Sequence, residues 1–267
     1  MQSPTLCGAA DLRIELKRFA CPQCRPVRIS VIVPAFNEEK LVGETLRRVQ
    51  NAASVLAERG WECEWIVCDN NSTDRTAELA RGAGAKVVFE PVNQIARARN
   101  TGAAAATGDW LIFVDADSHP SPELFEEVAE QIQGGRCLAG GCTLRMEVSG
   151  RWAWLGLHFW NWVSRTMRWF AGSFIFCEAG VFRRVGGFNQ ELYASEEIDL
   201  SKRLCALARQ TGKEIVILHR HPIVTSPRKL HLYSRRDYLR FFGRAILTGR
   251  GWQKHRKHCG LWYDGRR

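Results

Sequence analysis

The sequence of 267 residues contains no repeated segment and no apolar run long enough to cross a membrane. The stretch without formal charge from Trp152 to Ser164 is shorter than the roughly 20 apolar residues that a spanning helix needs. The first twenty residues carry charges and no apolar core, so we expect no signal peptide. We therefore expect a cytoplasmic protein, peripheral on the cytoplasmic membrane face if it contacts a membrane at all.

A complete set of zinc ligands is also lacking. Cys21 and Cys24 form one C-x-x-C pair, and Cys7 is a further thiol, but no second pair or spaced His pair accompanies them. We therefore interpret residues 1–27 as an N-terminal extension with ordinary thiols. The ten cysteines, without a secretory signal, favour free buried thiols in a reducing compartment.

Acidic residues are scarce at the C-terminal end. Residues 227–267 contain twelve Lys or Arg and only two acidic residues, whereas the other residues balance at 26 of each. The net charge of +10 therefore belongs to this tail. A neutral body argues against coating of nucleic acid by the whole surface, and no nucleic-acid module is present, so we expect no specific nucleic-acid partner.

The composition that is present suits a globular protein, with 45% apolar and 25% charged residues. Short, continuously apolar strands alternate with helices from residue 28 onward. Strands are predicted at 29–33, 65–68, 86–89 and 110–114, and helices at 38–59, 74–80, 95–106 and from Ser121, the expected N-cap. This alternation predicts an α/β fold of three layers, α/β/α, with a mostly parallel central sheet covered on both faces.

The second half alternates less regularly and predicts a mixed continuation of the same domain, 28–226. Its strands are expected at 138–148, 173–177 and 214–218, and its helices at 152–169 and 195–208, the latter capped by Ser195. The tail, 227–267, interleaves aromatic and basic residues and predicts a helical, basic and amphipathic C-terminal segment.

Polar residues follow three of the first four strands, at the sheet edge where ligands bind in such folds. They are Asn37–Glu38, Asp69–Asn70 and Asp115–Ala116–Asp117. Asp115 and Asp117 are spaced to face one hard cation such as Mg²⁺ or Mn²⁺; the alternative is a solvated turn before the next helix. Asp69 can accept a hydrogen bond from a uracil or a ribose, or it can simply form a turn.

The ordered set of motifs resembles the family 2 glycosyltransferases, which have the GT-A fold. The matching segments are 31–39, 67–74, 98–102, 108–117, 180–188 and 196–200. The resemblance covers about residues 28–228 and implies a nucleotide-diphosphate sugar as donor, a divalent metal and inversion at the anomeric carbon. It implies that Pro34, Phe36, Asn37, Glu38 and Asp69 hold the nucleotide.

The resemblance also assigns the acidic residues. Asp115 and Asp117 match the family's DxD motif, whose second Asp touches the metal. Glu196 and Glu197 match its acidic pair, whose second member is the base that takes the acceptor's proton. This makes Glu197 the first candidate for the base, and Glu196 and Asp199 are the other candidates. Both glutamates fall in the first turn of a helix, where the dipole favours their ionised form; ordinary charge placement at a helix start is the alternative.

Several further residues keep more than one interpretation. Arg97 and Arg99 either face the diphosphate or brace the acidic site; the alternative is an ion pair with Asp115 or a solvated helix face. His219 and His221 are expected just after the final strand. Some relatives use a histidine there as a further metal ligand, which would be His219; the alternative is that both are surface or packing residues.

The aromatic stretch and the tail bear on the acceptor. Five Trp within 152–169, accompanied by arginines, suit sugar stacking, a membrane interface or core packing. The tail either lies on an anionic membrane surface, covers the active site, or packs on the body. The sequence therefore leaves three classes of acceptor possible: a saccharide, a lipid or a small molecule.

Together these features predict a metal-dependent, inverting glycosyltransferase of the hexosyltransferase type. The alternatives are a polyprenyl-phosphate sugar transferase at the membrane surface and a noncatalytic module that binds a sugar nucleotide or lipid on the same fold.

Overall fold

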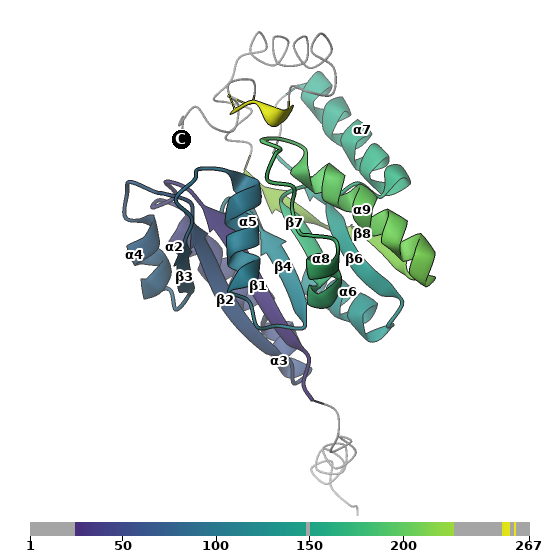
Figure 1. The fold of residues 1–267 in the computed structure, drawn as a ribbon, viewed down its shortest axis with the longest axis horizontal. Coiled ribbons are helices and arrows are strands. Elements are labelled where there is room, and N and C mark those ends of the chain that lie inside the picture. The colour runs from purple at the N-terminus through teal and green to yellow at the C-terminus, as the bar shows by residue number, and fades with distance from the viewer. Residues whose placement is uncertain (1–24, 148–149, 227–252, 257–258, 260–267) are drawn as a thin grey trace, which may run out of the picture.

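A computed structural model describes residues 25–147, 150–226, 253–256 and 259. Within these residues one sheet has the strand order β3-β2-β1-β4-β7-β6-β8-β5 (Figure 1). The strands are β1 (Arg28–Ala35), β2 (Glu62–Asp69), β3 (Lys86–Phe89), β4 (Trp110–Val114), β5 (Ser118–His119), β6 (Cys137–Arg145), β7 (Phe174–Glu178) and β8 (Glu214–Thr225). The helices are α2 (Val42–Ala52), α3 (Ser54–Glu58), α4 (Thr76–Gly82), α5 (Ile95–Ala104), α6 (Pro122–Gln133), α7 (Arg151–Met167), α8 (Ala179–Arg184) and α9 (Glu196–Thr211).

The first four long strands confirm the predicted parallel arrangement. β1 pairs in parallel with both β2 and β4, and β2 pairs in parallel with β3. The β-branched run of β1 is buried because it lies between two neighbours and under helices on both faces. β7 then runs antiparallel to β4 and β6, whereas β8 is parallel to β6, which confirms the mixed second half.

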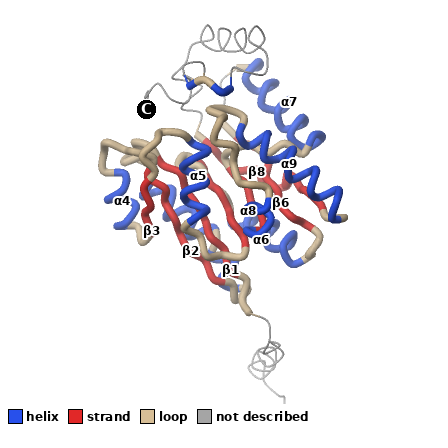
Figure 2. The backbone as a smooth tube through the Cα atoms, in the orientation of Figure 1, coloured by secondary structure: helices blue, strands red, loops and turns tan. Residues whose placement is uncertain are grey.

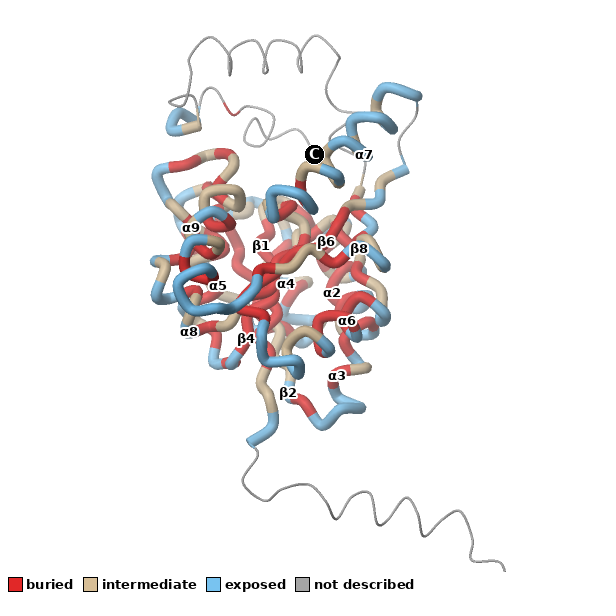
Figure 3. Tube along the Cα trace, turned by 90° about the vertical axis from the view of Figure 1, so that its right-hand side faces the viewer, coloured by how far each residue is buried: buried red, intermediate tan, exposed pale blue. Residues whose placement is uncertain are grey.

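Helices cover both faces of the sheet, as the three-layer prediction requires (Figure 2). One apolar cluster joins the inward side chains of α2 and α6 to alternate residues of β1, including Val31 and Val33. A second cluster joins α5, α8 and α9 to the opposite side chains, including Ile32. Figure 3 shows buried residues in the interior and exposed residues around them. The mostly parallel α/β fold class is thus confirmed, whereas the predicted helical tail lies almost wholly outside the described residues.

One predicted helix and one predicted helix cap differ in the structure. The expected helix 38–59 begins only at Val42 and is interrupted at Ala53, next to Ser54, whose hydroxyl donates to the carbonyl of Asn51 at 2.8 Å. Ser195 occupies the predicted N-cap position of α9, but at φ 62° its side chain makes no cap hydrogen bond, so the expected capping interaction is absent. Ser121 does cap α6, since its hydroxyl accepts from the backbone N–H of Leu124 at 3.3 Å.

The last strand is longer than predicted, and His219 and His221 lie inside it rather than after it. The pairing of β8 with β6 shifts register between Leu218 and Ile223 and then continues. The polar residues in this irregular stretch broke the apolar pattern on which the prediction rested. β5 and α8 were also not predicted, because both are too short to produce a periodic signal.

The cysteine prediction is confirmed where the structure describes thiols. Seven cysteines between residues 25 and 259 are free, and most are buried. Burial raises the pKa of the Cys68, Cys137 and Cys142 thiols to about 12, so they remain protonated and unreactive at neutral pH. Cys7, Cys21 and Cys24 lie outside the described residues. No helix in the described part is long and apolar enough to cross a bilayer.

Close approach of α5 to the sheet depends on Gly102. A Cβ atom at this position would lie 2.5 Å from Cγ2 of Ile32 in β1, which is well inside van der Waals contact. Because α5 also carries Arg99 toward the carboxyl edge of the sheet, this contact sets the depth at which Arg99 enters the fold.

We predict that Gly102→Ala lowers the free energy of unfolding by about 1–3 kcal/mol, because the added methyl forces α5 away from Ile32. The matched control is Gly43→Ala in α2, where a Cβ meets nothing within 4 Å and better helix propensity adds up to about 1 kcal/mol. Urea unfolding of both variants checks this; equal stabilities would show that the approach of α5 is not limiting.

Candidate functional site

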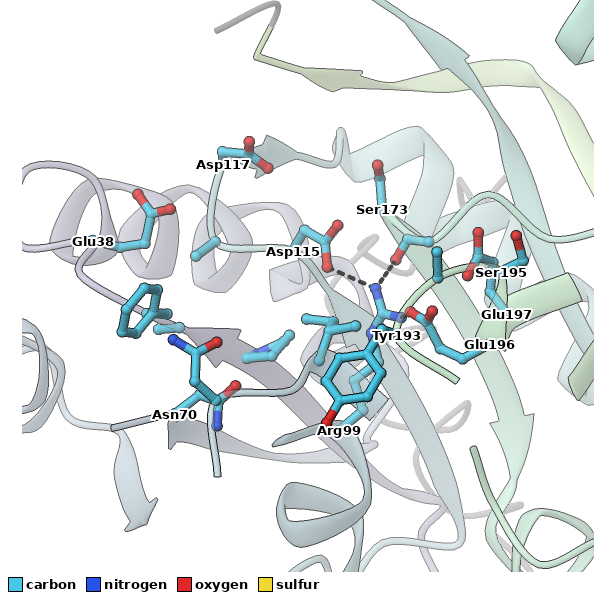
Figure 4. A pocket seen from close by; sticks show the side chains of 18 residues that line it. Glu38, Asn70, Arg99, Asp115, Asp117, Ser173, Tyr193, Ser195, Glu196 and Glu197 are labelled. Atoms are coloured by element: carbon cyan, nitrogen blue, oxygen red, sulfur yellow. Dashed lines mark hydrogen bonds and ion pairs between the residues drawn. The ribbon is translucent and has the colours of Figure 1, made fainter. Parts of the chain in front are cut away.

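A cavity of about 240 Å³ opens at the carboxyl edge of the parallel strands, where the topology placed the site. Its walls come from segments far apart in the sequence, and Figure 4 shows their side chains converging. The lining residues are Pro34, Ala35, Phe36, Glu38, Asn70, Asn93, Ile95, Arg99, Asp115, Ala116, Asp117, Gly172, Ser173, Tyr193, Ala194, Ser195, Glu196 and Glu197.

The Asp115–Asp117 segment is held rigidly at the cavity wall. β4 ends at Val114, and the backbone then turns, with the N–H of Ser118 donating to the carbonyl of Asp115 at 3.0 Å. The hydroxyl of Thr45 donates to the carbonyl of Ala116 at 2.6 Å, and the N–H of Ser226 donates to that of Asp117 at 3.1 Å. The two aspartates therefore lie in a turn and not in an extended strand, so the i, i+2 spacing does not by itself set their directions.

Arg99 lies at the centre of the site. Its guanidinium is 3% exposed and donates to Glu196 Oε1 at 2.7 Å and to Asp115 Oδ1 at 2.9 Å (Figure 4). It also donates to the carbonyl of Gly172 at 2.9 Å and lies over the ring of Phe188. Burial alone would lower the pKa of Arg99, but the surrounding carboxylates outweigh it and raise that pKa. The contacts of Arg99 contain the predicted ion pair with Asp115 and also fit the bracing interpretation, whereas burial rules out a solvated helix face.

The acidic pair at the start of α9 is not symmetrical. Both glutamates line the cavity, but Glu196 is buried and bound to Arg99, whereas Glu197 is half-buried. Burial, together with the neighbouring Glu196 carboxylate, raises the pKa of Glu197 to about 8. The dipole of α9 was expected to favour the ionised form of Glu197, but burial and like charge prevail. A carboxyl group with a pKa near neutrality is suited to accept a proton.

The donor set at the cavity wall fits a hard divalent cation. Asp117 and Asp115 bring carboxylate oxygens to the same cavity, and one oxygen of Asp115 is bound by Arg99. Within the described ranges no group of three or more His, Cys, Asp or Glu could hold a metal. A cation here would therefore rest on one or two carboxylates, which suits Mg²⁺ or Mn²⁺ completed by phosphate and water oxygens.

The residues predicted to hold the nucleotide divide into two groups. Pro34, Phe36 and Glu38 line the cavity, but Asn37 and Asp69 do not. The Asn37 side chain accepts from the backbone N–H of Thr73 at 2.8 Å, and Asp69 accepts from that of Ser72 at 3.0 Å. Both side chains therefore fasten the loops after β1 and β2, which for Asp69 matches the turn-forming alternative.

Asp199 and His219 lie away from the cavity. Asp199 pairs with Arg203 one turn along α9, at 2.7 Å. His219 is exposed within β8 and does not line the cavity, and its neighbour His221 contacts Glu127 of α6 at 2.5 Å. The placement of His219 therefore gives no support to a role as metal ligand.

Three polar lining residues were not singled out from the sequence, whereas Asn70 was, as a residue that follows β2. Asn93 comes after β3, so the rule that located the cavity could have included it. Ser173 precedes an antiparallel strand, which brings the amino end of β7 to this edge. Tyr193 precedes the acidic pair and is tied to the C-terminal part of the chain, since its N–H donates to the carbonyl of Gln253 at 2.7 Å.

The aromatic helix does not belong to the core. In α7 the side chains of Trp152, Phe159 and Trp162 are all more than 60% exposed, so the core-packing interpretation is wrong for them. None of these three lines the cavity.

The chain was compared with known proteins by sequence. Residues 30–186 match the model of the family described as glycosyl transferase family 2. An uncharacterized glycosyltransferase of Bacillus subtilis, EpsJ, is 29% identical over 128 residues, which cover 46% of this chain and 36% of that protein. A dolichol-phosphate mannosyltransferase of Pyrococcus furiosus is 32% identical over 123 residues, covering 43% and 33%. The matches thus span about a third of the length of these relatives.

A comparison of structures shows the same fold. A mannosyltransferase of Pyrobaculum calidifontis, solved in complex with GDP-Man and Mn²⁺, superposes with a TM-score of 0.59 at 19% identity, covering 94% of this chain and 75% of that one. At this identity the likeness demonstrates the architecture alone.

We predict that Arg99→Gln lowers the free energy of unfolding by about 3–5 kcal/mol, because it leaves Asp115 and Glu196 without their shared cation. The control is Arg75→Gln, which removes an exposed ion pair with Glu78 and should leave the unfolding midpoint almost unchanged. Chemical denaturation measures both; a small effect of Arg99→Gln would contradict its bracing role.

Glu197 should make stability depend on pH. Its pKa is raised from 4.5 to about 8, so between these values the folded state keeps a proton that the unfolded state has lost. Stability of the wild type therefore falls as pH rises through this window, and Glu197→Gln should become progressively more stable than wild type. Thermal unfolding from pH 4 to 9 measures the difference.

The control for that titration is Glu123→Gln. The Ser121 hydroxyl holds the pKa of Glu123 below its ordinary 4.5, so the effect of losing this carboxylate is complete by about pH 5 and the difference from wild type should stay constant from there to pH 9. A Glu197→Gln difference that is flat with pH would show that Glu197 is ordinarily ionised.

Proposed function

The chain belongs to glycosyl transferase family 2, and on that premise we propose that it transfers a hexosyl group from a nucleotide-diphosphate sugar to an acceptor hydroxyl, with a divalent metal and with inversion. The observation that carries the proposal is the meeting of Asp115, Asp117 and Glu197 around one cavity, although they come from separate parts of the chain. Arg99 joins Asp115 to Glu196, the residue that precedes Glu197.

The donor would enter between the loops after β1 and β2 and the Asp115–Asp117 turn. Phe36 and Asn70 line the cavity, and Figure 4 shows Asn70 on the side away from the start of α9. The amide N–H groups of Asn70 donate to the carbonyls of Glu90 and Val92, so Asn70 forms part of this wall while Phe36 offers an aromatic face. A nucleotide there would place its diphosphate toward Asp117. A Mn²⁺ or Mg²⁺ ion bound at this point would act as a Lewis acid on the departing diphosphate.

Glu197 is the proposed base. Inversion by a single displacement needs the acceptor oxygen to approach the anomeric carbon opposite the leaving diphosphate, and its hydroxyl proton must leave as the bond forms. Glu197 lies across the cavity from Asp117, on the wall formed by α9 (Figure 4). Its raised pKa makes it a stronger proton acceptor than an ordinary carboxylate. Glu196 is a weaker choice because its carboxylate is already bound to Arg99.

Arg99 is proposed as a positioning residue. Its bonds to Asp115 and Glu196 keep the metal-side turn and the start of α9 at a constant separation. Preorganised groups of this kind lower the barrier because the protein need not rearrange as charge develops.

A second acceptor class is suggested by the similarity to the dolichol-phosphate mannosyltransferase. A polyprenyl phosphate attacks through an oxygen that is already ionised at neutral pH, so it needs no base. The two acceptors are therefore separable by Glu197→Gln, which should abolish transfer to a hydroxyl and spare transfer to a phosphate. A noncatalytic binding module would bind the donor but release no nucleoside diphosphate with any acceptor.

We predict that the protein releases nucleoside diphosphate from a matching nucleotide sugar only when Mn²⁺ or Mg²⁺ is present. Asp117→Ala should lower the rate about 100-fold or more, and Glu197→Gln by about 10²–10⁴ with a hydroxyl acceptor or water. Thermal-shift screening with nucleotide sugars and Mn²⁺ would identify the donor first, since binding to the native state raises the melting temperature.

Matched controls lie at the opposite edge of the sheet. Asp109→Asn and Glu214→Gln remove carboxylates there and should leave the rate unchanged. If the wild type binds donors but neither hydrolyses nor transfers them, with metal and with both acceptor classes, the catalytic proposal fails.

A further inference from the structure

The aromatic side chains of α7 face outward, whereas an ordinary surface helix directs its apolar side chains toward the core. Trp152, Leu155, Phe159 and Trp162 follow the i, i+3, i+7, i+10 spacing of one helical stripe. Their side chains are 80%, 48%, 64% and 62% exposed, and Figure 3 shows most of α7 exposed along its length. A contiguous apolar stripe of this size on a surface marks an interaction site.

Polar residues, by contrast, fasten the inner side of α7. The Asn161 amide donates to the carbonyl of Leu144 at 2.9 Å and accepts from its N–H at 3.0 Å, like an added partner of β6. The Ser164 hydroxyl, fully buried, donates to the carbonyl of Trp169 at 2.6 Å. These bonds hold the helix in one orientation and leave its aromatic stripe directed away from the body.

The charged side chains of α7 and of the cavity beside it are all basic. α7 contains arginines and no acidic residue. At its C-terminal end a second cavity, of about 560 Å³, lies between α7 and α9 and is lined by Arg168, Lys202, Arg209 and Lys213, again without an acidic residue. The Lys202 ammonium lies 5.0 Å from the ring centre of Trp169 in this cavity. Basic groups beside outward Trp and Phe match the interfacial region of an anionic bilayer.

We propose that α7 and the adjoining basic cavity form a docking surface for an anionic phospholipid bilayer, with the aromatic stripe entering the headgroup region and the basic cavity binding lipid phosphates. Other occupants fit less well by charge. The tail, 227–267, carries the whole net charge of +10, and a second copy of the chain would bring the same basic surface. The basic residues of the docking surface would therefore repel both.

Docking in this way would bring the catalytic cavity close to the membrane. α7 lies beyond the same edge of the sheet as the cavity, above α9 in Figure 1. The segment that leaves α7 reaches Gly172 and Ser173, which line that cavity, within a few residues. The docking surface does not depend on the proposed transferase activity, so binding to vesicles can be measured without substrate.

The test is co-sedimentation of the full chain with phosphatidylcholine vesicles and with phosphatidylcholine–phosphatidylglycerol vesicles. The wild type should bind the anionic vesicles, and high salt should weaken binding without abolishing the aromatic contribution. The triple variant Trp152→Ala, Phe159→Ala, Trp162→Ala should bind at least about tenfold more weakly. The matched control is Phe89→Ala with Val92→Ala, which removes exposed apolar side chains elsewhere and should bind like wild type.

A second pair of variants examines charge. Lys202→Gln with Arg209→Gln should reduce the preference for anionic vesicles, whereas Arg47→Gln with Arg81→Gln, on helices α2 and α4, should not. Brominated lipids should quench tryptophan emission of the wild type and quench the aromatic variant less. Trp152→Ser changes only the most exposed position of the stripe and preserves the inner contacts of α7. Weaker binding by this variant would therefore not be caused by loss of folding.

The proposal is overturned if the wild type fails to bind anionic vesicles. It is equally overturned if the aromatic variant binds like wild type while Arg235→Gln, Arg236→Gln and Arg240→Gln together abolish binding, because the tail is then the docking element.

Discussion

Arg99 is buried between two carboxylates that lie far apart in the sequence, one at the end of β4 and the other at the start of α9. The first half of the sheet supplies Asp115, and the mixed second half supplies Glu196. Their shared guanidinium joins the two halves across the cavity. A buried cation of this kind is stable only while both partners are present, so the geometry of the site and the packing of the domain depend on the same contacts.

This arrangement concentrates negative charge where a folded protein would ordinarily avoid it. Asp115, Asp117, Glu196 and Glu197 surround one cavity, and Arg99 compensates only part of their charge. The consequence is most direct at Glu197, where burial and then the neighbouring Glu196 carboxylate raise the pKa to about 8. The protein thus keeps a carboxyl group in a state that lowers its own stability near neutral pH, which is common at sites built for proton transfer and cation binding.

The first half of the fold could be predicted because its signals are local. Continuous apolar strands, helix spacing and polar strand ends together indicated the edge of the sheet at which the cavity opens. The prediction weakened where partners are distant: β8 continues through His219 and His221 because β6 and β5 pair with it, and polar residues hide that pairing in the sequence. The motif 37–38 was located, yet Asn37 turns away to fasten a loop, since a side chain's direction depends on the local backbone angle.

The sequence by itself determined the family, the α/β class, the neutral body with its basic tail and the acidic residues that meet at the site. Only the tertiary structure decided which of those residues share the cavity, that Arg99 bonds to Asp115 and Glu196, and that the tryptophans of α7 face outward. The physical reason is that composition and periodicity record each residue's preference for water or core. Ion pairing, pKa and exposure depend instead on neighbours brought together by long-range packing.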